Sequence, residues 1–308
     1  MQPIPAQRST QQFIDGSEQE RGLTGWTQRY AQTEPGPYRG VIEQLTLPGI
    51  TVSRERVERA VEQSTAPPEG RVIFCQSLVR AGPWRFNAQS CAQGLTGFIR
   101  GGEEHLAVLP AGAEVLMVEA DQALLARDLD ENPARMVLEG AFLALPEAQE
   151  VRLLAEWFTL LLATSGGISA LTPDLVLYNL GRLWGRARRE AVALGSGTRG
   201  DYHIFRRAQA LMQAGALETP SVSALAAELG VPVPALHRAF LQTAGIGPVE
   251  WLRRHRLDGA RRDLRQADPD TRVTDVAMKW GFLHLGRFSA AYTAQFGESP
   301  SATLRTAR

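Results

Sequence analysis

Ala226, Gly230 and Leu236 stand four and six residues apart near the C-terminus. A small residue lets two helices approach closely, a Gly permits a left-handed turn, and an apolar residue seats the second helix on the first. This spacing is typical of a helix-turn-helix, whose second helix can enter the major groove of duplex DNA. The first interval returns 51 residues later in a segment that contains Ala277, Gly281 and Phe288.

The second helix of the first segment has a polar face suited to base edges. When the segment is wound as a helix, Pro234, His237 and Arg238 lie opposite Leu236 and Phe240. Arg238 is the predicted base contact, because its guanidinium can bond guanine O6 and N7 together. Contact with a phosphate is the alternative. In the second segment the corresponding exposed positions are His284, Arg287 and Ser289.

A helix that joins the two segments is predicted over residues 249–266, with Leu257, Ala260 and Leu264 at i, i+3 and i+7. Such a spacer could hold the two units about one DNA turn apart, roughly 34 Å. Residues 199–308 carry 15 basic and 10 acidic side chains, whereas residues 1–198 carry 18 and 23. The C-terminal part is therefore the one expected to meet a polyanion. A helical bundle without a DNA role is the alternative.

The N-terminal part alternates short β-rich runs with Gly and Pro, which is typical of a small barrel or sandwich. Residues 54–63 fit a helix or a strand. Further helices at 146–164 and 173–194 either pair subunits or cover the barrel. Residues 195–200 have the composition of a flexible linker. The expected strands are 41–47, 72–79, 95–99, 105–109 and 114–118.

These elements predict an α+β fold. A small cupin-like β-barrel with a helical pairing segment precedes an all-α domain with two helix-turn-helix units. The expected boundaries are a disordered tail at 1–23, a mixed domain at 24–198 and a helical domain at 199–308. The chain has no run of about 18 apolar residues and no signal-peptide pattern at its N-terminus. We therefore expect a cytoplasmic protein that does not enter a membrane.

No group of residues indicates catalysis. His105 follows Glu103 and Glu104 but lacks the two-His spacing of a metal-binding barrel. Cys75 and Cys91, 16 residues apart, match no redox or metal pattern. With no phosphate-binding Gly-rich loop either, we expect no enzyme, no metal and no cofactor. An aromatic and charged set either lines a small-molecule pocket or belongs to the core: Trp84, Phe86, Phe98 and Arg100.

Short motifs through residues 221–304 carry a resemblance to a known family. They are Gly281-Phe282 followed by Phe288, the run Phe-Gly-Glu-Ser-Pro at 296–300, Gly247-Pro248, and Arg256-Leu257. With these motifs the segment resembles the DNA-binding domain of the AraC/XylS family of bacterial regulators. The run Trp-Gly-Phe-Leu-His-Leu-Gly-Arg-Phe at 280–288, with residues 25–30 and 35–40, is similar to the ethanolamine-operon regulator subgroup of that family.

The resemblance implies a transcription regulator, usually an activator, with double-stranded DNA as its partner. It implies that residues 24–198 form a sensory and dimerisation domain. A small effector bound there, RNA polymerase and a second copy of the chain are the further expected partners. A regulator without a small ligand is the alternative. The family often has a longer polar residue where Gly286 and Ala290 stand, so direct base readout by the second unit is expected to be weak.

Overall fold

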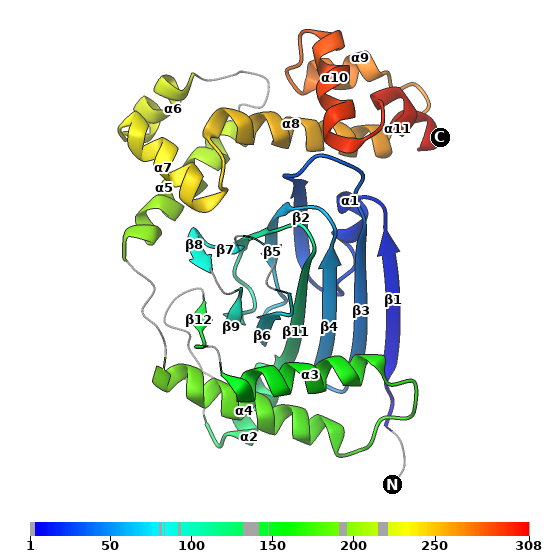
Figure 1. The fold of residues 1–308 in the computed structure, drawn as a ribbon, viewed down its shortest axis with the longest axis vertical. Helices are drawn as coiled ribbons and strands as arrows, with labels where there is room; N and C mark the ends of the chain where they lie inside the picture. Colours follow the sequence, from blue (N-terminus) through cyan, green and yellow to red (C-terminus); the bar gives the residue numbers. More distant parts are fainter. Residues whose placement is uncertain are drawn as a thin grey trace.

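The computed structural model describes residues 4–79, 82, 84–91, 94–131, 142–146, 148–190, 196–214 and 221–307. Two antiparallel sheets enclose the core of the N-terminal part. Two long helices lie along one side of this part, and the C-terminal helices lie across the opposite end (Figure 1). The predicted α+β class is confirmed.

The larger sheet has seven strands in the order β1-β3-β4-β11-β6-β9-β12. Their bounds are β1 Gln7–Phe13, β3 Gly40–Leu47, β4 Ile50–Val57, β11 Ala113–Asp121, β6 Arg71–Ser77, β9 Thr96–Arg100 and β12 Leu143–Ala144. The smaller sheet has five strands in the order β2-β5-β10-β7-β8. Their bounds are β2 Thr27–Gln32, β5 Val61–Ala66, β10 His105–Leu109, β7 Trp84–Phe86 and β8 Gln89–Cys91.

Alternating side chains of the larger sheet serve two different cores. Along β11, Val115 and Met117 face the interior between the sheets, whereas Leu116 and Val118 face the covering helices. This alternation follows from the two-residue repeat of a strand. The covering helices are α2 Gln122–Asp128, α3 Gln149–Ala163 and α4 Thr172–Glu190.

The C-terminal part is helical and has two cores of its own. Phe205, Phe240 and Trp251 meet edge to face in the first, and Phe288 with Tyr292 fills the second. Aromatic side chains bury large apolar areas and so dominate such small cores. The helices are α5 Ser196–Ala214, α6 Val222–Leu229, α7 Val233–Thr243, α8 Pro248–Arg265, α9 Val273–Lys279, α10 Leu285–Phe296 and α11 Pro300–Thr306.

Several local expectations differ from the structure. The segment predicted as a disordered tail contains β1, which pairs with β3 over its whole length, and the short helix α1 Gly16–Gln19. Its polar side chains did not prevent order because β1 completes the backbone hydrogen bonds of the sheet edge. Residues 54–57 belong to β4 and residues 61–63 to β5, with a short connection between them. The expected linker overlaps α5, which begins at Ser196, while residue 195 lies outside the described residues.

Candidate nucleic-acid interface

The first helix-turn-helix is formed by α6 and α7. The Ser221 hydroxyl caps α6 by accepting a hydrogen bond from the backbone of Ala224 at 3.1 Å. Gly230 ends the helix with a φ of +67°, a conformation that a Gly adopts without strain. Leu236 is fully buried under the turn. The roles predicted for the Ala226, Gly230 and Leu236 pattern are therefore the ones these residues have.

The outer face of α7 carries the three residues predicted to contact DNA. Pro234, His237 and Arg238 are all exposed with the N-terminal part in place. The Arg238 Nε lies 3.2 Å from Asp201 Oδ1 of α5, and its side chain remains 58% exposed. This pair holds the base of the guanidinium and leaves its outer edge accessible. Contact with DNA stays a prediction for these residues.

The second helix-turn-helix is formed by α9 and α10. Gly281 makes the turn with a φ of +77°, and the Phe282 backbone N–H donates to the Ala277 carbonyl at 2.9 Å. Phe288 is buried beneath the turn. The three residues predicted to face DNA are exposed or half-buried: His284, Arg287 and Ser289.

Helix α8 connects the two units and belongs to both cores. Trp251 near its start packs in the first core, and Leu257 and Leu264 pack in the second. Gly259 lies against the ring of Trp280, where a Cβ would fall 2.2 Å from the ring. The Trp280 Nε1 donates to Asp263 at 2.8 Å. The predicted spacer helix is thus fixed to both units by packing.

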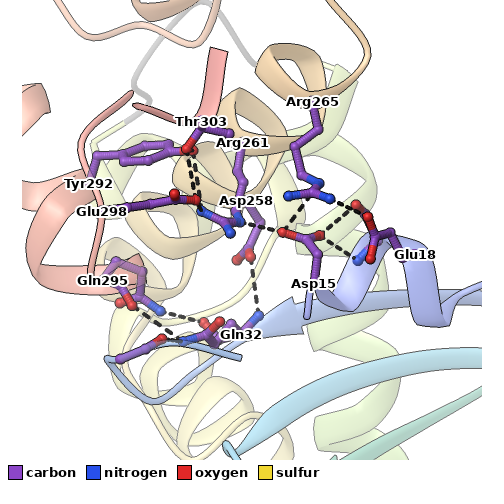
Figure 2. A network of polar contacts seen from close by, with 12 residues as sticks. Asp15, Glu18, Gln32, Asp258, Arg261, Arg265, Tyr292, Gln295, Glu298 and Thr303 are labelled. Atoms are coloured by element: carbon purple, nitrogen blue, oxygen red, sulfur yellow. Dashed lines mark hydrogen bonds and ion pairs between the residues drawn. The ribbon is translucent and has the colours of Figure 1, made fainter. Parts of the chain in front are cut away.

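Three arginines in the second half of α8 face the N-terminal part. Arg261 Nε lies 2.5 Å from Asp15 Oδ2, and Arg262 lies 2.6 Å from Glu20. Arg265 pairs with Glu18 (Figure 2). In this arrangement the guanidinium groups of Arg261, Arg262 and Arg265 are engaged by carboxylates of the N-terminal part. In this region the acidic side chains of the N-terminal part and the basic side chains of α8 form ion pairs between the two parts.

The interface continues along α8 toward its start. Glu62 of β5 is buried and accepts hydrogen bonds from Trp251 Nε1 at 2.7 Å and His255 Nε2 at 2.9 Å. Arg254 donates to the Thr33 carbonyl. Further along, the Gln295 side chain donates to the Gln32 carbonyl at 2.7 Å, so α10 is held as well. Buried polar groups with matched partners fix one relative placement of the two parts.

Two carboxyl groups of this interface titrate abnormally. Burial alone would raise the pKa of Asp15, but Arg261, Ser17 and Arg265 outweigh it and leave the pKa below its usual value. Burial raises the pKa of Asp258 to about 7. Asp258 Oδ1 accepts a hydrogen bond from the Gln32 backbone at 3.2 Å, a weaker compensation than a close ion pair.

The four residues predicted to line a ligand pocket are not brought together. Trp84 and Phe86 face the interior between the sheets. Phe98 lies on the opposite face of its sheet and meets Trp184 of α4 edge to face at 5.2 Å. Arg100 is exposed. Trp84, Phe86 and Phe98 all belong to the core, the alternative considered for this set, and a ligand-binding role for the four residues stays a prediction.

Several hollows adjoin the N-terminal sheets, and two of them bear on function. A cavity of about 30 Å³ between the sheets is lined by Trp84, Phe86 and the buried Glu55, which the sequence did not single out. A cleft of about 790 Å³ lies between the two parts, with Glu62 and Trp251 in its walls. Among the described residues no group of His, Cys, Asp and Glu side chains is placed to hold a metal ion. His105 stacks on Phe86.

Some residues at the interface escaped the sequence reasoning. Asp15, Glu18 and Glu20 lie in the segment expected to be a tail, and Glu62 lies in an ambiguous one. The charge difference between the two parts was the signal that could have indicated them. In the part of the chain that the structure describes, no helix is both long and apolar enough to cross a bilayer.

Comparison with known proteins identifies the C-terminal part. Residues 225–306 match the family described as a helix-turn-helix domain. The probable thc operon regulatory protein of Rhodococcus erythropolis is 41% identical over 104 residues, which cover 33% of this chain and 31% of that protein. The XylDLEGF operon transcriptional activator of Pseudomonas putida is 41% identical over 81 residues, covering 26% of this chain and 25% of that protein.

A solved structure is also similar to about a third of this chain. It is a probable AraC family transcriptional regulator from Rhodopseudomonas palustris, 31% identical, covering 34% of this chain and 98% of that one, with a TM-score of 0.32. The chain spans about a third or less of the length of the two curated relatives. Residues 225–306 thus form a helix-turn-helix domain, and the chain is similar to operon regulators over part of its length.

Proposed function

We propose that this protein is a transcription regulator that binds a specific duplex DNA site with both helix-turn-helix units. The observation that carries the proposal is the attachment of both units to α8 with the outer faces of α7 and α10 exposed. A single rigid helix gives the two recognition helices a fixed separation, as a site with two half-sites on one face of DNA requires. Relatives that are named operon regulators support the same conclusion.

Binding to pooled genomic fragments, sequenced after selection, tests this proposal across a salt series. A regulator should enrich one motif with two half-sites about one turn apart. Its affinity should fall with salt according to the number of phosphates contacted. Weak binding without a motif and with a steep salt dependence would contradict the proposal, because binding of that kind requires only a basic helical surface.

We further propose that a small effector, bound by the N-terminal part, controls this binding. Two features support the idea. Within the described chain, Trp84 Nε1 and Thr65 Oγ1 are buried without a hydrogen-bond partner, and both residues line the cavity between the sheets. Buried polar groups without partners are costly, and a polar ligand would satisfy them. Contacts of α8 with β5 give the effector a physical route to the DNA-binding units.

Thermal unfolding with a panel of metabolites tests the effector. A ligand that binds the native state raises the Tm. Likeness to the ethanolamine-operon subgroup places ethanolamine and adenosylcobalamin on the panel. The cavity of about 30 Å³ admits only a few atoms without repacking, whereas the interdomain cleft of about 790 Å³ admits a larger molecule. No shift with any compound would contradict the effector and leave the DNA-binding proposal intact.

One observation favours a second function for the N-terminal part, namely pairing of subunits or contact with a partner protein. Apolar side chains are exposed in rows along two of the covering helices: Leu153 and Leu160 on α3, and Leu175 and Tyr178 on α4, with Leu171 just before α4. Rows of this kind mark protein contact surfaces more often than isolated apolar residues do. Sedimentation velocity of the full chain tests the pairing. A monomer at all concentrations would contradict a homodimer.

A further inference from the structure

The start of the second recognition helix exposes two large apolar side chains. Leu283 is 81% exposed and is the most exposed large apolar residue among those described. Leu285, the first residue of α10, is 43% exposed. They flank His284, which precedes the helix directly. A single exposed Leu needs no explanation, but two beside the expected DNA contact give that surface an apolar character.

Apart from its first residue and Arg287, the outward face of α10 carries only small side chains at its start. Phe288 and Tyr292 point into the core, so Gly286 and Ala290 lie on the opposite side, as the helical repeat requires. No atom lies within 4 Å of the place where a Cβ of Gly286 would be. The helix backbone can therefore approach base edges closely. Arg287 is exposed at the side of this face, where it is suited to a phosphate.

The first unit presents a different surface. Its outer face carries His237 and Arg238, both of which can hydrogen-bond to base edges. The major groove displays one apolar feature, the 5-methyl group of thymine, which apolar side chains contact. Apolar side chains at the start of α10 thus match one kind of base, just as the polar face of α7 matches others.

We propose that the second helix-turn-helix recognises thymine through its 5-methyl groups, with Leu283 and Leu285, exposed at the start of α10, as the contacting side chains. This inference rests on the proposed DNA-binding function. It assigns polar readout to the half-site bound by α7 and methyl readout to the half-site bound by α10. The partner is the DNA major groove because these leucines continue the surface of a helix-turn-helix domain.

Substitution of deoxyuridine for thymidine tests the proposal, because uracil lacks only the 5-methyl group. The site selected with the full chain is synthesised with each thymidine of the second half-site replaced in turn. Loss of one buried methyl should weaken binding about fourfold. With the wild-type protein, we expect deoxyuridine to weaken binding at one or two positions of the half-site. With Leu283→Ala or Leu285→Ala, deoxyuridine at those positions should leave the affinity of the variant unchanged. Leu241→Ala, at the far end of α7, should retain the full effect.

The outcomes separate this inference from the proposed function. Tight, motif-specific binding that is unchanged by every deoxyuridine would overturn methyl readout while the regulator stands. Leucine variants that bind more weakly but keep the deoxyuridine effect would also overturn it. Absence of any selected motif would instead contradict the proposed function. Circular dichroism melting of both variants should match the wild type, since neither leucine is buried, so loss of binding cannot arise from unfolding.

Discussion

Replacement of Arg261 by Met should strongly destabilise the joint between the two parts. The Arg261 side chain is 11% exposed, pairs with Asp15 at 2.5 Å and with Glu298 at 2.8 Å, and lies 4.6 Å over the ring of Phe296. Methionine keeps much of the apolar stem and removes the charge. Asp15, whose side chain is 3% exposed, then loses its closest cationic partner.

The magnitude follows from what remains around Asp15. Removal of one partner from a buried pair costs about 3–5 kcal/mol. Arg265 Nε at 3.6 Å and the Ser17 backbone N–H at 2.9 Å still face the carboxylate, so we expect the lower end, about 3 kcal/mol. Asp15→Asn removes the stranded charge and should recover about 1–2 kcal/mol in the double variant.

Urea unfolding of the wild type, both single variants and the double variant measures this coupling. The low pKa of Asp15 means that the pair stabilises the fold above the ordinary carboxyl value of 3.8, and that this stabilisation disappears as the pH falls through the lower folded value. The coupling should therefore be full at pH 7 and vanish in strong acid. Additive losses within about 0.5 kcal/mol at pH 7 would refute the reasoning.

Three further predictions concern single side chains. Arg238→Ala should weaken specific DNA binding by about 1–3 kcal/mol and relax preference at one base pair in gel-shift titrations; equal losses on all sequences would make Arg238 a phosphate contact instead. Asp258→Asn should stabilise the fold by about 1–3 kcal/mol at pH 8, because burial raises the carboxyl pKa to about 7. Since stability of the wild type then falls between about pH 4 and 7, the gain should shrink toward pH 4, and a gain equal at pH 5 and 8 would contradict this. Gly259→Ala should lower stability by about 1–3 kcal/mol in urea unfolding despite about 1 kcal/mol of better helix propensity, because the new methyl falls 2.2 Å from the Trp280 ring. A net gain would show that the ring moves aside freely.

The helix-turn-helix units could be predicted from sequence because their determinants are local. Ala226, Gly230 and Leu236 act within one pair of helices, so their spacing alone indicates the turn. The spacer helix was predictable for the same reason, since its apolar repeat lies within a single element.

The interface between the two parts could not be predicted because its partners are far apart in sequence. Asp15 and Arg261 are separated by 246 residues, and no local pattern relates them. The unequal charge of the two parts was interpreted as a sign of binding to a polyanion, and it does not say which residues of the two parts would pair. The placement of the predicted pocket residues could not be derived from sequence for a related reason: which face of β9 carries Phe98 depends on the pairing of β9 with β6, which spacing along the chain does not reveal.

The length of helix α8 sets two distances at once, the separation of the two recognition helices and the spacing of its contacts with the N-terminal part. Its 18 residues span about 27 Å. Insertion of one residue near its middle would turn everything beyond it by about 100° and advance it by about 1.5 Å. The second recognition helix would lose its phase on DNA, and the arginines would turn away from their carboxylates on the N-terminal part. Substitutions on the exposed face of α8 change neither of these geometries, whereas a change in its length disturbs both DNA binding and the contact between the two parts. The length of α8 should therefore tolerate less change than its sequence.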